Sequence, residues 1–184
     1  MASYFESITE EQAALVRGAR MFFVATADPQ MAKGPQGAGP VNISPKGGIR
    51  LHVLSRNRVA YLDRSGSGNE TARHSLAGGP ITVMVCSFEE ENAAIVRLYG
   101  RASVTPVADS ALAQRLLQEE AAELKWPWRH VVEIEVEGAA TSCGYGVPVM
   151  AFVRDRRSAD RGRKYKSEGL SKSSAVKTAR IKAD

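Results

Sequence analysis

The chain has 184 residues, of which 43% are hydrophobic and 24% are charged, as is ordinary for a folded protein with one buried core. No apolar run approaches the roughly 20 residues that a membrane-spanning helix needs, and the first residues lack the pattern of a secretory signal. The two cysteines, Cys86 and Cys143, have no metal-binding spacing; this disfavours a disulfide scaffold or a zinc site and predicts a cytoplasmic location.

The net charge of +5 is unevenly distributed along the chain. Residues 154–184 carry 11 Lys and Arg against 4 Asp and Glu, whereas residues 1–153 carry 14 against 16. The basic segment has too few apolar residues to offset the entropy of ordering itself. We therefore expect one folded domain at 1–153 and a flexible, solvated tail at 154–184. Nucleic-acid contact by the tail is the less favoured interpretation, because no aromatic interleaving supports it.

The apolar pattern predicts many short strands and few helices. Thr9 and Gln12 form the capping-box pattern of a helix start, and residues 130–138 alternate between apolar and charged side chains as in a half-buried strand. The strand expected at 81–88 has no polar alternation, which indicates that both of its faces are buried. In chain order we expect a helix at 9–20, strands at 21–27, 41–44, 49–54 and 59–62, a helix at 70–77, strands at 81–88 and 94–107, a helix at 109–124 and a strand at 130–138. This pattern is typical of a compact antiparallel barrel that is mainly β with flanking helices.

Several chemistries find no support in the sequence. The three histidines, His52, His74 and His130, are scattered, and no Gly-x-Ser-x-Gly motif presents a nucleophile. No His, Cys, Asp or Glu pair has metal-ligand spacing on one helix. The Gly/Pro-rich loop at 29–40 does not end in Gly-Lys-Ser/Thr, so it is not a P-loop.

Phosphate binding is better supported. The stretch YLDRSGSGNETARH runs from a strand into a helix start, and Gly68 lets the backbone approach a ligand closely. Ser67, Asn69 and Thr71 offer hydrogen bonds where a helix start favours an anion. Lys46, at the end of the strand VNISPK, adds an ammonium group. The alternative is a plain turn in which Asn69 caps the helix and Lys46 lies on the surface.

A second unusual stretch is TSCGYGVP, in which two glycines flank Tyr145. One interpretation is a tight chain reversal that packs Tyr145 on the barrel. The other is a backbone that lies against a planar ligand, with Tyr145 as one wall. The residues alone leave both open.

Five segments, taken in chain order over roughly residues 15–110, resemble the pyridoxamine 5′-phosphate oxidase-like family of FMN-binding split barrels: FFVATA, VNISPKG, NRVAYLDRSGSGNETARH, ITVMVCSF and IVRLYGRASV. The segment CGYGVP is similar to the signature of a subgroup described as flavin-binding. The resemblance implies a split antiparallel β-barrel and a homodimer that holds FMN at the subunit interface.

The resemblance also implies roles for single residues. The strand VNISPK passes the flavin ring and ends with Lys46 on the phosphate, and the segment SGSGNET closes over that phosphate. Arg97, in IVRLYG, matches an arginine of the family's corresponding strand. A buried cation needs an anionic partner, which is either the cofactor or a carboxylate such as Asp63. The cofactor-binding residues expected are Asn42, Ser44, Lys46, Asp63, Ser67, Gly68, Asn69, Thr71, Arg97 and Tyr145, with Asn42, Ser44 and Thr71 closest to the ring.

Two departures narrow the function that the resemblance implies. Glu70, Thr71 and Ala72 stand where the true oxidases carry Ser-Arg-Lys, so no second cation is expected at the phosphate. The Arg and Trp that the oxidases place near their vitamin substrate have no counterpart. The leading hypothesis is an FMN-dependent oxidoreductase of unknown small-molecule substrate. The alternatives are a flavin-binding or stress-protective protein without turnover, or a split barrel that binds haem, with His74 as a ligand, or a deazaflavin.

Overall fold

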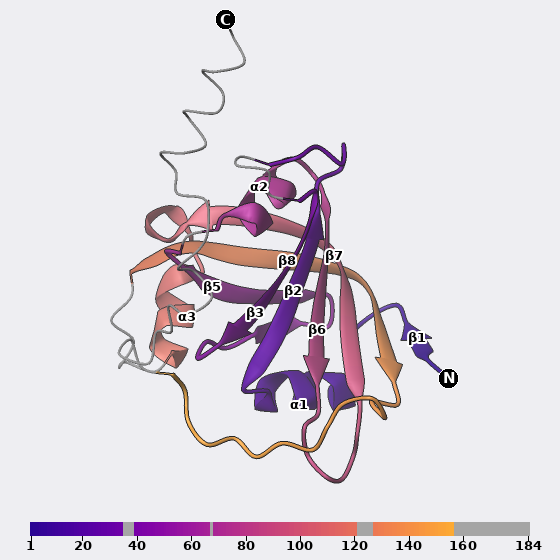
Figure 1. Cartoon of the computed structure of the whole chain (residues 1–184). Helices are drawn as coiled ribbons and strands as arrows, with labels where there is room; N and C mark the ends of the chain where they lie inside the picture. Colours follow the sequence, from indigo (N-terminus) through magenta and orange to yellow (C-terminus); the bar gives the residue numbers. More distant parts are fainter. Residues whose placement is uncertain (35–38, 67, 121–126, 157–184) are drawn as a thin grey trace, which may run out of the picture.

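The computed structural model describes residues 1–34, 39–66, 68–120 and 127–156. In this part of the chain one antiparallel sheet of eight strands curls around a core, and three helices cover its ends and one edge (Figure 1). The strands are β1 (Ser3–Phe5), β2 (Met21–Ala27), β3 (Val41–Gly47), β4 (His52–Ser55), β5 (Arg58–Arg64), β6 (Pro80–Cys86), β7 (Ile95–Pro106) and β8 (Trp128–Ser142). The helices are α1 (Glu10–Gly18), α2 (Glu70–Leu76) and α3 (Ala113–Glu119), and a 3-10 turn, η2 (Val107–Asp109), follows β7. The predicted class, mainly β with flanking helices, is confirmed.

The order of the strands explains why the barrel is split. The strands follow the spatial order β3-β2-β6-β7-β8-β5-β4, and β1 pairs with the end of β8. β3 and β4 are neighbours in the chain, yet they lie at opposite ends of this order. The sheet therefore has a seam between β3 and the β4–β5 hairpin.

The core fills the inside of the curled sheet. Alternate side chains of each strand point inward, as in Phe22 and Val24 of β2, and both are almost fully buried. The predicted capping box of α1 is present: Thr9 Oγ1 accepts from the Gln12 N–H, and the Gln12 side chain accepts from the Thr9 N–H. Val16 of α1 packs into the core. A smaller apolar cluster joins β5 to α3 through Leu62 and Leu116 and completes the packing on that side.

The strands β7 and β8 approach each other unusually closely at Gly100. Their register shifts between Tyr99 and Gly100. A Cβ atom added at Gly100 would collide with the carbonyl oxygen of Glu135 on β8. This position therefore requires glycine because no side chain fits.

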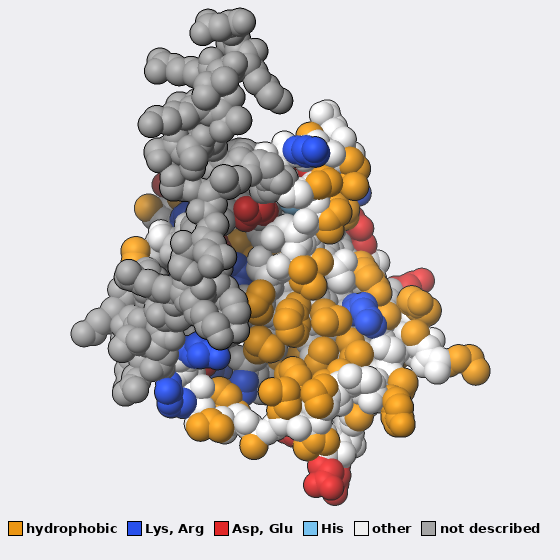
Figure 2. All heavy atoms as spheres, in the orientation of Figure 1, with side chains coloured by type: hydrophobic (Ala, Val, Ile, Leu, Met, Phe, Trp, Pro, Cys, Tyr) orange, Lys and Arg blue, Asp and Glu red, His pale blue; other side chains and the backbone are white. Residues whose placement is uncertain are grey.

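The outer face of β3, β2 and β6 is apolar. Val41 and Ile43 of β3 are 60% and 65% exposed, and Phe23, Ala25 and Met84 on the neighbouring strands are only half-buried. Strand register sets Ala25 beside Ile43 and Phe23 beside Met84, so these side chains form one continuous surface. Figure 2 shows hydrophobic side chains gathered there. We call these five residues the outer apolar face.

Some expected elements differ from those observed. β6 is buried on one face only, because Thr82 and Met84 are half-buried; the expectation of two buried faces was wrong. The helix expected at 109–124 starts later than expected: Asp109 belongs to η2, and α3 begins at Ala113. Residues 121–124 lie outside the described residues. Most of the expected tail, residues 157–184, also lies outside them. No helix in the described ranges is long and apolar enough to cross a membrane.

Candidate anion-binding pocket

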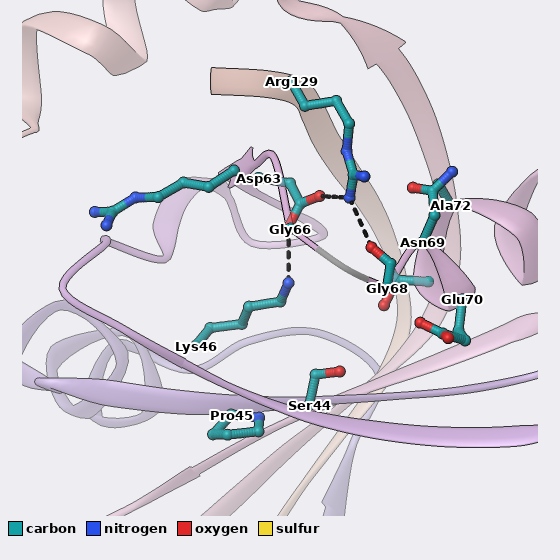
Figure 3. A pocket seen from close by; sticks show the side chains of 12 residues that line it. Ser44, Pro45, Lys46, Asp63, Gly66, Gly68, Asn69, Glu70, Ala72 and Arg129 are labelled. Atoms are coloured by element: carbon teal, nitrogen blue, oxygen red, sulfur yellow. Dashed lines mark hydrogen bonds and ion pairs between the residues drawn. The ribbon is translucent and has the colours of Figure 1, made fainter. Parts of the chain in front are cut away.

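A pocket of about 320 Å³ lies at the seam of the barrel, where β3 and β5 end and α2 begins (Figure 3). β3 alternates, so that Asn42, Ser44 and Lys46 share its inner face while Val41 and Ile43 point outward. The pocket is lined by Ser44, Pro45, Lys46, Asp63, Arg64, Gly66, Gly68, Asn69, Glu70, Thr71, Ala72 and Arg129.

At its centre one carboxylate bridges two cations. Asp63 Oδ1 accepts a hydrogen bond from Lys46 Nζ at 2.7 Å, and Asp63 Oδ2 accepts one from Arg129 Nη2 at 2.8 Å. The side chains of Lys46, Asp63 and Arg129 are 18%, 11% and 25% exposed, so this ion triad is largely shielded from solvent. Burial alone would raise the pKa of Asp63, but the hydrogen bonds from Lys46 and Arg129 outweigh burial and lower it. Asp63 is therefore ionised at neutral pH.

The triad links strands that the sheet keeps apart. Lys46 is on the terminal strand β3, whereas Asp63 and Arg129 are on the paired strands β5 and β8. Asp63 pairs with His130 in the ladder and Arg64 pairs with Trp128, so Arg129 is the extra residue of a bulge. A bulge re-aims a side chain, and here it directs Arg129 toward Asp63. The Lys46–Asp63 ion pair thus joins the two sides of the seam.

A third cation, Arg64, lines the same pocket. Its Nη2 donates to the carbonyl oxygen of Gly48 at 2.6 Å, and its guanidinium lies 4.8 Å from the ring centroid of Trp128. Burial lowers the pKa of Arg64, and nearby Glu120 and Asp155 partly offset that effect. The pocket thus holds three cations and two carboxylates, those of Asp63 and Glu70.

Two of these cations carry hydrogen-bond donors without an acceptor. The Nε atoms of Arg64 and Arg129 are buried and have no partner among the described residues. A buried N–H group without an acceptor is costly, and such groups are normally satisfied by protein, water or ligand. These Nε atoms have almost no exposed surface, so a ligand in the pocket would not reach them. The three cations that line the pocket nevertheless suit it chemically to an anion with several acceptor oxygens, such as a phosphate.

Six of the ten predicted site residues line this pocket: Ser44, Lys46, Asp63, Gly68, Asn69 and Thr71. Asn42 lies next to it on β3 and donates to Ser44 Oγ at 3.1 Å. Ser67 lies outside the described residues. Asn69 is the N-cap residue of α2 but its side chain makes no capping hydrogen bond, and Lys46 is ion-paired with Asp63. The role of this segment in phosphate binding stays a prediction.

Arg97 and Tyr145 lie away from the pocket. Arg97 of β7 pairs in register with Met84, next to the outer apolar face, and donates to Ser142 Oγ at 3.1 Å. The suggestion that Asp63 is its partner was wrong, because Asp63 binds Lys46 and Arg129 instead. Tyr145 is 93% exposed in a turn, so the interpretation that it packs on the barrel was also wrong. Contacts of Arg97 and Tyr145 with a flavin stay predictions.

His74 is not presented to any ligand. It is fully buried in α2, its Nδ1 lies 2.9 Å from Thr26 Oγ1, and its Nε2 lies 3.0 Å from Arg73 Nη2. Both ring nitrogens are thus engaged by neighbouring side chains. A haem-ligating role for His74 is excluded in this structure.

Sequence reasoning missed Arg129 and Arg64 as pocket residues. The expectation that no second cation lies at the phosphate considered only the positions next to α2, whereas Arg64 and Arg129 line the pocket from other strands. Arg129 is 66 residues from Asp63 in the chain, and only the bulged pairing of β5 with β8 brings them together. The sole signal in the sequence is an arginine at the start of a long strand, which is not specific.

Comparisons with known proteins fit this architecture. No family model matches the chain. The protein ustO of Aspergillus flavus, a pyridoxamine 5′-phosphate oxidase family protein, is 32% identical over 157 residues, which are 84% of this chain and 59% of ustO. The chain thus spans about three fifths of the length of that curated relative.

Among solved structures, a HupZ variant of Group A Streptococcus has a TM-score of 0.54 at 22% identity, covering 73% of this chain and 99% of that chain. An FMN-binding protein of Syntrophomonas wolfei has a TM-score of 0.50 at 12% identity, covering 77% and 90%.

The fold and the pocket define a split-barrel protein with a cation-lined pocket at the split. The chain is, in particular, a relative of the pyridoxamine 5′-phosphate oxidase family, and the resemblance of its motifs to that family is confirmed.

Proposed function

We propose that this chain binds FMN and that the pocket at the seam receives the FMN phosphate. The observation that carries the proposal is the convergence of three cations, Lys46, Arg64 and Arg129, on one pocket. A phosphate supplies both the negative charge and the acceptor oxygens that such a site needs. The FMN-binding protein of Syntrophomonas wolfei, which has a similar fold, supports the choice of a flavin.

The residues on the inner face of β3 are suited to the rest of the cofactor. Ser44 Oγ accepts a hydrogen bond from Asn42, so its own proton is available to a ligand. The buried Thr71 offers a second hydroxyl at the pocket wall. We propose that Asn42, Ser44 and Thr71 bind the ring side of FMN, while Ser67, Gly68 and Asn69 bind the phosphate side. When bound, the flavin supplies electron transfer, and the chain supplies binding and orientation.

We further propose that the protein is a homodimer whose interface is the outer apolar face. An apolar sheet face of this kind is costly in water, and a second copy of the chain would cover it. Such an arrangement also accounts for β6, whose sequence lacks polar alternation although one of its faces is half-exposed in the single chain. Arg97 borders this face and would then reach the flavin of the second subunit rather than its own.

The dimer proposal has a direct test. Ile43→Lys places a charge at the centre of the proposed interface, so the variant is expected to sediment as a monomer at concentrations at which the wild type is a dimer. Leu117→Lys serves as the control, at an exposed residue of α3, which packs against β5 at the other end of the strand order from β3. A wild-type protein that sediments as a monomer contradicts the proposal.

As for activity, we propose an FMN-dependent oxidoreductase of the cytoplasm that acts on a small molecule. Oxidation of pyridoxamine phosphate is not proposed, because the family's residues near that substrate have no counterpart in this chain. The second candidate is flavin binding without turnover. Reduction of the bound flavin by NADPH or NADH, followed by reoxidation at a useful rate, distinguishes the first candidate from the second.

The cofactor proposal is tested by titration. FMN, riboflavin and FAD are added to flavin-free protein, and flavin fluorescence reports binding. FMN is expected to bind best, because riboflavin lacks the phosphate. Lys46→Gln should weaken FMN binding roughly ten- to hundredfold, the scale of a hydrogen bond to a charged group, with little effect on riboflavin. Lys33→Gln, at an exposed residue away from the pocket, is the control. Equal affinity of the wild type for FMN and riboflavin refutes the phosphate assignment, and preferential binding of a deazaflavin or haem refutes the choice of FMN.

A further inference from the structure

The carboxylate of Asp63 occupies an unexpected place for a site that binds an anion. It lies directly between Lys46 and Arg129, the two cations best placed to hold a phosphate. A second carboxylate, that of Glu70, also lines the pocket but makes no ion pair with either cation in the described part of the chain. If charge alone mattered, both carboxylates would repel a phosphate and oppose its binding.

The geometry nevertheless leaves both cations able to bind a ligand while they hold Asp63. Lys46 has three N–H groups and uses one for Asp63. Arg129 uses Nη2 for Asp63 and for the carbonyl oxygen of Gly68, while its Nη1 makes no hydrogen bond to the described residues. Asp63 therefore fixes the position of each cation without consuming its capacity to donate.

Asp63 is itself held firmly. It is part of the β5–β8 ladder, and its side chain is 11% exposed. Lys46, by contrast, is on the terminal strand β3, across the seam, and lysine is the more flexible partner of the pair. Without Asp63, Lys46 and Arg129 would also repel each other across the pocket. An anchored carboxylate thus offsets that repulsion and removes rotamer freedom that a ligand would otherwise have to remove.

We propose that Asp63 is a positioning residue, which aligns Lys46 and Arg129 across the seam so that they can receive the phosphate of the ligand. This inference rests on the proposed function, because it takes a phosphate-bearing flavin as the ligand. It predicts opposite signs for the two carboxylates: Asp63 favours binding of the phosphate, and Glu70 opposes it.

The test compares Asp63→Asn with Glu70→Gln, which removes the same charge from the same pocket without breaking an ion pair. The dissociation constants for FMN and riboflavin are measured at fixed salt, and the preference for FMN over riboflavin is the readout. Asp63→Asn should reduce this preference roughly tenfold, the scale of immobilising one or two long side chains. Glu70→Gln should increase it about threefold, because a repelling charge is removed.

A general loss of structure would weaken both ligands alike, so the preference for FMN separates positioning from folding. If Asp63→Asn does not fold, Asp63→Glu replaces it: the charge is kept but the reach is altered, and the preference for FMN should still fall. An unchanged or increased preference in the foldable variant overturns the inference while the proposed function stands. A wild-type protein with no preference for FMN overturns both.

Discussion

The hydroxyl group of Tyr61 offers a sharp test of the buried core next to the pocket. Tyr61 is fully buried in β5, and its hydroxyl has no hydrogen-bond partner among the described residues. Burial, with a smaller contribution from Asp63, raises the pKa of Tyr61, so the group stays neutral. Tyr61→Phe removes the hydroxyl but keeps the edge-to-face contact with Phe22, whose ring centroid lies 5.3 Å away.

The expected effect of this change is stabilisation. A hydroxyl buried without a partner costs about 1–3 kcal/mol, so removing it is stabilising. The small void that its removal leaves is destabilising and cancels part of this gain. We expect the free energy of unfolding to rise by about 1 kcal/mol, which for a domain of this size raises Tm by about 2–4 °C.

Urea unfolding of flavin-free protein measures this difference directly, and the m-value should not change. Tyr4→Phe, at a tyrosine that is 76% exposed, is the matched control and should lie within about 0.5 kcal/mol of the wild type. Destabilisation of Tyr61→Phe by about 1 kcal/mol or more would mean that the hydroxyl has an acceptor in solution, such as a buried water. The reasoning from an unsatisfied group would then be refuted.

Three further predictions follow from the structure. Because folding lowers the pKa of Asp63, its ionised form stabilises the protein above the unfolded pKa of about 4, and that contribution is lost as the pH falls through the folded pKa. When unfolding is measured at decreasing pH, Asp63→Asn should therefore lose less stability than the wild type. Gly100→Ala should destabilise by about 2 kcal/mol or more through collision with Glu135, whereas Gly146→Ala, with open space around it, should be nearly neutral in the same urea experiment. Deletion of residues 157–184 should leave the FMN affinity unchanged in a fluorescence titration, and a loss would mean that the domain extends into that segment.

Local patterns predicted the fold class and one wall of the pocket. The resemblance of VNISPK to the family's strand implies roles for Asn42, Ser44 and Lys46, and the structure has all three on the inner face of β3. The glycines and small polar residues after β5 predict a turn that approaches a ligand, and Gly68 and Asn69 line the pocket. Each of these features depends on residues within a few positions of one another, where strand period and turn chemistry determine the outcome.

The remaining wall could not be predicted in this way. Arg129 reaches Asp63 through a bulge, and a bulge depends on the pairing of β5 with β8 rather than on local composition. Arg97 is expected at the site because it matches an arginine of the family's corresponding strand, and an arginine among apolar residues needs a partner. Which face of β7 it occupies depends on register, and the partner observed is Ser142. His74 was the ligand of the haem alternative, yet tertiary packing engages both of its nitrogens.

The alternation of β3 has an evolutionary consequence. Its even-numbered residues, Asn42, Ser44 and Lys46, face inward, while Val41 and Ile43 form part of the outer apolar face. Because successive side chains point to opposite sides, inserting or deleting one residue in this strand would exchange the two sets. Both the inner and the outer surface would be lost in one event. Point substitutions can therefore alter either surface by itself, but the length of this strand is constrained by both together.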